Sequence, residues 1–235
     1  MAWSFAGSDH AYVAAATSMS LTPPATPGLF YAWVFAFNGV AAGSGPWVKP
    51  WATGDPPNAI GPAGVGTVLL ASQTLSATSA SFDFAGLSAA FSHLRIYALL
   101  RGTAAAVSVN AQIRFNNDSG ANYDDQAVYA HATTAGGAAT SAGTSAIFGG
   151  VTASNATAGE YGIVVAELPF YTATNARKTF AGTSTSYDTA GTTSTYWTMV
   201  QGGSWRNSAA VNQVTIFPAS GSWAAGSAVS VYGVA

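Results

Sequence analysis

From residue 66 onward the chain consists of short runs in which apolar and polar residues alternate. The run 107–115, VSVNAQIRF, has apolar residues at its odd positions and Ser, Asn, Gln and Arg between them. A period of two directs one set of side chains to a buried face and the other to solvent, as in an antiparallel strand. Comparable runs recur between clusters of Gly, Ser, Thr and Asn. The pattern predicts an all-β fold for residues 66–235, an antiparallel β-sandwich of jelly-roll type.

The scarcity of charge limits the classes of function. Charged residues make up 7% of the chain, against about 25% in an ordinary globular domain. Ser, Thr, Asn and Gly therefore supply the polar surface, and these residues favour strands and turns over exposed helices. The net charge is −2 and the Lys and Arg residues are scattered, which argues against nucleic-acid binding through phosphates. Absence of cysteine excludes disulfides and thiolate metal sites, and we expect no cofactor.

Residues 1–65 differ from the remainder, because they hold eight of the ten prolines and four of the seven tryptophans. Strands are expected at 11–21 and 29–37, followed by a stretch rich in turn-forming residues at 41–64. We interpret 1–65 as a β and loop region that attaches the sandwich to a partner, with tryptophans as its anchors. The expected anchors are Trp33, Trp47 and Trp51.

The N-terminus and the longest apolar run bear on localisation. The start, MAWSFAGSDH, lacks the basic and apolar segments of a secretory signal. The longest apolar run, residues 29–37, is too short to span a bilayer as a helix. We expect synthesis in the cytoplasm and no membrane insertion.

The stretch 114–126, RFNNDSGANYDDQ, concentrates Asn and Asp in a chain with few acids. These residues, with Ser and Gly, form turns because they accept positive φ angles or hydrogen-bond to their own backbone. We interpret it as the turn of a hairpin whose strands are 107–115 and 123–131. For the low-complexity segment 133–159 we expect a long loop with one weak strand. A calcium loop is the alternative, although the EF-hand spacing fails at its fifth and last ligand positions. The weak calcium candidates are Asn116, Asp118 and Asp124.

No catalytic residue is predicted. Asp124 and Asp125 are neighbours, so a strand directs them to opposite faces. Glu160 and Glu167 also face opposite sides if one unbroken strand holds both. The sequence contains no nucleophile, zinc-protease or phosphate-loop motif. A glycan depolymerase is kept as an alternative that requires two carboxylates in one cleft.

Three tryptophans of the predicted sandwich are candidate glycan contacts, because an exposed indole face stacks on a sugar ring. The other interpretation is core packing, since a Trp side chain buries a large area. The candidates are Trp197, Trp205 and Trp223.

The 114–126 stretch resembles a module of virion proteins from tailed bacteriophages, in which a strand ends in F-N-x-D-x-G-x-N-Y. The matching residues are Phe115, Asn116, Asp118, Gly120, Asn122 and Tyr123. A later I-x-x-Y segment followed by K-T resembles Leu168–Tyr171, with Leu in place of Ile, and Lys178–Thr179. A terminal V-x-V-Y-G strand resembles Val229–Gly233. The resemblance covers roughly residues 66–235, and residues 1–62 match less well.

The resemblance implies a non-enzymatic structural protein on the exterior of a tailed-phage virion. The implied positions are a head decoration, a head fibre or a compact tail appendage, docked through residues 1–65. Implied partners are other virion proteins and further copies of this chain, with a homotrimer favoured. The alternative function is a carbohydrate-binding module of a tail fibre or tail tip that recognises a glycan of the host surface.

Overall fold

The computed structural model describes residues 30–31, 50–51, 66–190 and 193–235. The chain divides into two units, residues 1–61 and 62–235, and each is described by itself.

In the first unit, Phe30–Tyr31 (β1) pairs antiparallel with Pro50–Trp51 (β2). Strand β1 falls within the strand expected at 29–37. The strand expected at 11–21 lies outside the described residues, as do Trp33 and Trp47.

The second unit contains antiparallel strands and, in its described residues, no helix. Its strands are Thr67–Thr74 (β3), Phe82–Ala85 (β4), His93–Leu100 (β5), Ser108–Phe115 (β6), Tyr123–His131 (β7), Thr134–Gly143 (β8), Ala146–Thr152 (β9), Gly162–Pro169 (β10), Lys178–Ala190 (β11), Thr193–Trp205 (β12), Gln213–Pro218 (β13) and Ala228–Val234 (β14). The predicted all-β antiparallel sandwich is confirmed.

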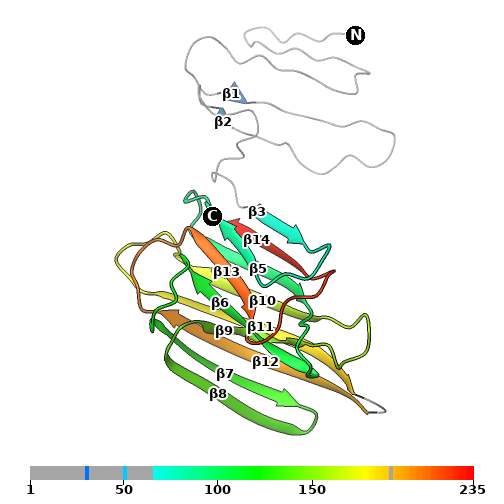
Figure 1. Cartoon of the computed structure of the whole chain (residues 1–235). Coiled ribbons are helices and arrows are strands. Elements are labelled where there is room, and N and C mark those ends of the chain that lie inside the picture. The colour runs from blue at the N-terminus through cyan, green and yellow to red at the C-terminus, as the bar shows by residue number, and fades with distance from the viewer. Residues whose placement is uncertain (1–29, 32–49, 52–65, 191–192) are drawn as a thin grey trace, which may run out of the picture. The chain divides into compact units, whose positions relative to one another are not determined.

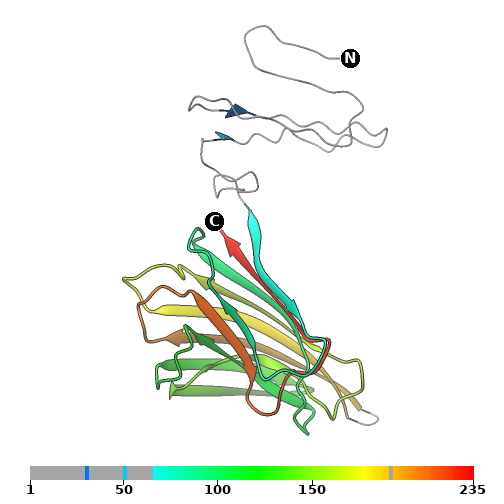
Figure 2. The same cartoon turned by 45° about the horizontal axis from the view of Figure 1, so that its top comes forward.

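The strands form two sheets with jelly-roll connectivity. The larger sheet has the order β3-β14-β5-β10-β11-β12-β7-β8, and the smaller has the order β4-β13-β6-β9 (Figure 1). The first four strands of the larger sheet and the whole smaller sheet make the eight strands of a double Greek key. The hairpins β7–β8 and β11–β12 are additions that follow β6 and β10 and extend the larger sheet. Figure 2 shows the two sheets as layers.

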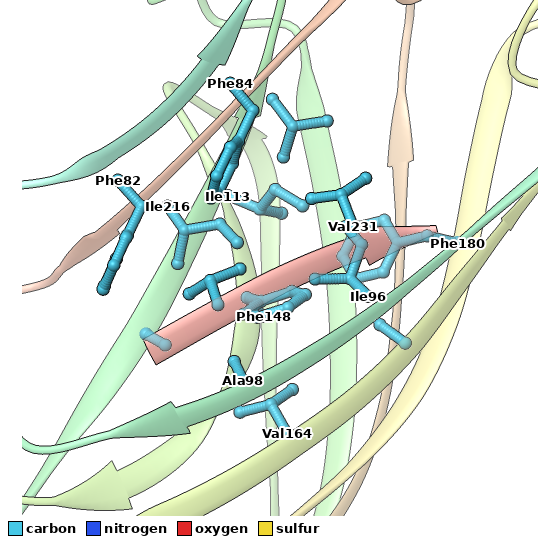
Figure 3. Packing of buried hydrophobic residues seen from close by; sticks show 14 of the residues in the cluster. Phe82, Phe84, Ile96, Ala98, Ile113, Phe148, Val164, Phe180, Ile216 and Val231 are labelled. Carbon is cyan, nitrogen blue, oxygen red and sulfur yellow. The ribbon is translucent and has the colours of Figure 1, made fainter. Parts of the chain in front are cut away.

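The core lies between these layers, where each strand contributes every second residue. Strand β5, for example, buries alternate residues from Leu94 to Leu100 and turns the intervening ones outward. Aromatic and aliphatic side chains from both sheets meet there (Figure 3). The labelled residues are Phe82, Phe84, Ile113, Phe148 and Ile216 from the smaller sheet and Ile96, Ala98, Val164, Phe180 and Val231 from the larger. Full burial of one such side chain contributes about 1.5–3 kcal/mol to the free energy of unfolding.

Strand β9 is an edge of the smaller sheet, yet all its residues are buried. Its unpaired backbone groups are satisfied by side chains of the facing sheet. The Ile147 amide donates to the carboxylate of Asp125 at 3.1 Å, and the Gly150 amide donates to the Ser184 hydroxyl at 3.0 Å. The side-chain amide of Gln201 donates to a carbonyl of β9 at 2.6 Å. Buried polar side chains thus take the place of a fifth strand.

Two local predictions are wrong. Strands β6 and β7 have the expected ranges and are joined by a turn, but they belong to different sheets and do not form a hairpin. The segment 133–159 is not a long loop with one weak strand, because two strands, β8 and β9, occupy much of it. Pairing with β7 imposes extended structure on β8, whose many Ala and Gly residues have low strand propensity.

Candidate functional site

The turn between β6 and β7 joins the two sheets at one end of the sandwich. Asn116 and Asn117 have φ angles of 51° and 55°, a left-handed conformation that Asn tolerates better than most residues. The Asn116 side-chain oxygen accepts the amides of Asn212 and Gln213 at 2.8 and 3.2 Å. Its amide group donates to the Ala210 carbonyl at 2.8 Å. The side chain therefore ties the turn to the loop before β13.

Asp118 lies in the same turn and acts as an acceptor for three donors. The indole N–H of Trp205 donates to it at 2.7 Å, the Gly120 amide at 2.8 Å and the Asn122 side chain at 2.9 Å. The Trp205 hydrogen bond is the largest cause that holds the pKa of Asp118 below its usual value. The carboxylate thus connects the turn to the end of β12.

Tyr123 begins β7 with its side chain fully buried. Its hydroxyl accepts the Phe115 amide at 2.9 Å and lies 3.1 Å from the Asp118 carbonyl. The Phe115 ring packs between the rings of Tyr123 and Trp205, with centroids 6.4 and 6.1 Å away. Burial raises the pKa of Tyr123 to about 12.

Lys178, from the K-T segment, is buried at the start of β11. Its ammonium group donates to the carbonyls of Ala173, Ala176 and Ser208 at 2.6, 2.9 and 3.1 Å. Burial lowers the pKa of Lys178. The turn and this lysine, both of which belong to the sequence resemblance, thus fasten one end of the sandwich.

The calcium candidates do not converge on one point. The oxygens of Asn116 and Asp118 already accept the donors described above. Asp124 lies on the outer side of β7, where Arg206 donates to it at 2.5 and 2.7 Å. That guanidinium holds the pKa of Asp124 at about 2. Within the described ranges, His, Asp and Glu form no group of three that could hold a metal ion.

The carboxylates considered for catalysis are separated as the strand geometry requires. Asp124 faces outward and Asp125 faces β9, and burial raises the pKa of Asp125. Glu167 lies on β10 and pairs with Arg95 of β5. Glu160 precedes β10, so one strand does not hold both glutamates.

Trp205 and Trp223 are 1% and 0% exposed. Trp205 donates to Asp118, and Trp223 donates to the Ile216 carbonyl at 3.1 Å. A sugar ring has no access to either indole face, so the prediction of glycan contacts is wrong for these two residues. They are core residues whose indole N–H groups donate hydrogen bonds within the sandwich.

Trp197 differs, because it is partly exposed on β12. Its ring stacks on His131 with centroids 4.5 Å apart, and the Tyr129 ring lies 5.0 Å away. Its indole N–H is buried and has no hydrogen-bond partner. Trp197, Tyr129 and His131 form an aromatic cluster on the inner side of the hairpin extension.

A larger feature is the outer side of the larger sheet. Two neighbouring rows of outward residues cross β5, β10, β11, β12 and β7 in register and contain no charge. Val128 and Val200 are each 61% exposed, and Ile163 is 51% exposed. The rows are Tyr97, Val165, Thr183, Val200 and Val128, and Leu99, Ile163, Thr185, Thr198 and Ala130; we call them the apolar face.

The outer side of the smaller sheet has the opposite character. Gln213 and Thr215 donate to Asp83 at 2.7 and 3.2 Å. The guanidinium of Arg114 lies 4.5 Å from the ring centroid of Phe217. This side has the polar residues expected where an antiparallel sheet meets water. The apolar face is therefore a property of one sheet and not of the whole sandwich.

The sequence carries a signal for the apolar face in two continuous apolar runs and not in its motifs. Residues 97–100, YALL, and 163–166, IVVA, are continuously apolar where a strand with one wet side alternates. Continuous apolar strands indicate that both sides are covered.

Comparison with family models, with curated proteins and with solved structures gives no match. In the described part of the chain, no helix has the length and apolar character needed to cross a membrane.

Proposed function

We propose that this chain is a non-enzymatic structural protein on the exterior of a tailed-phage virion. The observation that carries the proposal is the apolar face, a broad uncharged surface of the kind that marks contact between proteins. The polar residues of the resemblance motif also support it. The side chains of Asn116 and Asp118 are engaged in hydrogen bonds within the sandwich, as expected of structural residues.

The fold is compatible with this role. Double-sheet jelly rolls occur in viral capsid and lectin domains. Because one fold serves many functions, the assignment to a virion rests on the resemblance of the ordered segments in 66–235.

In the proposed arrangement, residues 1–65 dock the sandwich onto capsid or tail proteins as a head decoration, head fibre or compact tail appendage. Trp33, Trp47 and Trp51 serve as its anchors, and the chain is a homo-oligomer with three-fold symmetry. The protein is made in the cytoplasm of the bacterial host and ends on the virion surface.

Cryo-electron microscopy of purified virions, with this chain carrying an epitope tag bound by a Fab fragment, tests the proposal. Fab density on the capsid lattice identifies a decoration or head fibre, and density at the tail identifies an appendage. Absence of the chain from purified virions would refute the proposal. The full-length variant with Trp47→Ala and Trp51→Ala is expected to lose particle binding, whereas Asn110→Ala on β6 is expected to retain it.

The aromatic cluster favours a second candidate, a carbohydrate-binding module of a tail fibre or tail tip. Trp197 offers a partly exposed indole, which suits stacking on a sugar ring. Titration with host polysaccharide, followed by tryptophan fluorescence, tests it. Binding that persists in Trp197→Ala would exclude this cluster as the site.

A further inference from the structure

Two buried oxygen atoms between the sheets, Oδ1 of Asp125 and Oε1 of Gln201, have no hydrogen-bond partner among the described residues. The two residues are 7% and 2% exposed. Their other polar atoms are occupied. The Ile147 amide donates to Oδ2 of Asp125 at 3.1 Å, and the side-chain amide of Gln201 donates to the Phe148 carbonyl at 2.6 Å. Buried polar atoms are rarely left unpaired, so these two oxygens require a physical reason.

The register of the larger sheet places the two side chains next to each other. Asp125 of β7 lies opposite Gly203 of β12, and Gln201 is two residues away on the same inner side of β12. Diagonal neighbours of this kind are about 7–8 Å apart at their α-carbons, within reach of long side chains. Both side chains also bind consecutive residues of β9, Ile147 and Phe148. Their polar ends therefore converge on the same part of β9.

The protonation state of Asp125 decides whether the two oxygens are compatible. An ionised carboxylate and an amide oxygen are both acceptors, and neither can satisfy the other in an interior of low polarity. A carboxylic acid removes the conflict, because its O–H can donate to Oε1 of Gln201 while its other oxygen still accepts the Ile147 amide. Burial raises the pKa of Asp125, which agrees with a proton held in the folded state.

The charged groups at this end of β7 leave Asp125 without a cation. Asp124 and Arg206 pair with each other, and Asp124 lies on the outer side of β7. The negative charge of Asp124 adds to the rise in the pKa of Asp125. Tyr123 shares the inner side of β7 with Asp125 and is neutral well into the alkaline range, because its pKa is about 12.

The strands packed against Asp125 bring polar but uncharged groups to it. Strand β12 contributes Gln201, and β9 contributes backbone groups. Thr140 of β8 lies opposite Asp125, and its polar groups oppose the rise in the pKa of Asp125. On β6, which pairs with β9, Arg114 donates to the Thr144 carbonyl at 2.8 Å. Gln201 is therefore the acceptor that a protonated Asp125 requires.

We propose that Asp125 is a carboxylic acid in the folded protein and donates its proton to Gln201, which makes this pair a pH-sensitive contact between the larger sheet and β9. In the protonated state both oxygens are paired, and β9 is held at Ile147 and Phe148. Loss of the proton leaves a buried charge beside an unpaired acceptor, which the closed contact disfavours. Opening of the contact gives the carboxylate access to water and loosens the start of β9. This inference concerns the sandwich alone and does not depend on the proposed function.

The direction of the pH effect follows from linkage. Aspartate in the open or unfolded chain ionises near pH 4, and the closed contact raises the pKa of Asp125. The contact therefore contributes fully below about pH 4 and weakens as pH rises through the pKa of the folded state. Between those two values the equilibrium for opening shifts by up to about 10-fold per pH unit, because one proton is released.

The first measurement detects the proton directly in the full-length chain. ¹³C NMR with labelled Asp carboxyl and Gln amide carbons follows each signal from about pH 3 to about pH 9. One Asp carboxyl is expected to titrate above the ordinary value near 4, and Gln201 is expected to report the same midpoint. Both changes are expected to be absent from Asp125→Asn and retained in Asp83→Asn, a control on the smaller sheet.

Two results would overturn the inference. An Asp125 carboxyl that titrates at or below the ordinary value is ionised in the folded state and cannot donate. A raised midpoint at Asp125 without any response of Gln201 would show that the proton goes to another acceptor. Both results come from the wild-type chain, so the test stands even if a substitution prevents folding.

The second measurement tests whether the contact opens. Hydrogen exchange of the Ile147 amide is expressed as a protection factor, which removes the intrinsic dependence of exchange on pH. In the wild type this factor is expected to fall by up to about 10-fold per pH unit while Asp125 loses its proton. Asp125→Asn supplies a permanent donor to Gln201 and an acceptor for Ile147, so its protection factor is expected to stay constant. Equal pH dependence in the two chains would refute the contact as the pH-sensitive element.

Discussion

Replacement of Tyr123 by Phe removes one hydroxyl from the centre of the turn between β6 and β7. The ring and its packing against Phe115 and Trp205 are kept. What is lost is the acceptor of the Phe115 amide at 2.9 Å, in a residue that is 0% exposed. A buried amide left without a partner costs about 1–3 kcal/mol. We expect Tyr123→Phe to lower the free energy of unfolding by that amount, and the melting temperature by about 2–4 °C per kcal/mol.

Urea unfolding of the full chain, followed by tryptophan fluorescence, measures this change through the midpoint at constant slope. The control is Tyr196→Phe, because Tyr196 is 60% exposed on β12. It is expected to change stability by less than about 0.5 kcal/mol. Equal unfolding free energies for wild type and Tyr123→Phe would refute the assignment of the hydroxyl as the partner of that amide.

The same substitution is expected to change how the unfolding free energy depends on pH in the alkaline range. In the unfolded chain the phenol ionises near pH 10, whereas burial raises the pKa of Tyr123 to about 12 in the folded protein. The folded state holds the proton more tightly, so stability falls as pH rises from the lower value through the higher one. Tyr123→Phe is expected to lack this contribution to the alkaline fall.

Three further substitutions test other parts of the sandwich. Lys178→Met leaves three carbonyls without their donor and is expected to lower the unfolding free energy by about 1–3 kcal/mol. Arg177→Met, at the exposed neighbouring position, is the control. Equal urea midpoints for Lys178→Met and the wild type would contradict the role of the lysine. Gly203→Ala places a Cβ against a buried phenylalanine ring, with one ring carbon at 2.7 Å, and is expected to cost about 1–3 kcal/mol by calorimetry. Gly202→Ala, on the outer side of the same strand, is expected to cost less, and the reverse order would contradict the strand register. Burial raises the pKa of Asp125, so the folded wild type holds this proton more tightly than the unfolded chain and loses stability as pH rises from about 4. Asp125→Asn is expected to reduce this loss of stability. An unchanged dependence of the unfolding free energy on pH would show that another group is responsible.

The sequence was sufficient for the class of fold but not for the partners of its strands. The alternation in 107–115 correctly gave β6 with its buried side. It could not say that the next strand belongs to the other sheet, because a period of two is the same in both sheets. The positive φ angles of Asn116 and Asn117 set that change of direction, and Asn in a turn is compatible with several turn types.

Strand β8 was missed for a different reason. Its residues, TAGGAATSAG, have low intrinsic preference for strands, and pairing with β7 determines their conformation. The solvent exposure of each tryptophan could not be predicted from the sequence either. The residue type is the same for the buried Trp205 and the partly exposed Trp197. Burial depends on contacts between distant segments, such as Asp118 with the end of β12.

The side chains that cover β9 have a mechanical consequence. Asp125, Ser184 and Gln201 belong to one sheet and hold backbone groups of the other at fixed positions along β9. Apolar contacts resist separation of two layers but allow them to shift, since hydrophobic attraction has no direction. These hydrogen bonds do have direction, so a shear between the layers must break all of them together. A lateral force on one layer is therefore passed to the other layer without the two layers sliding past each other.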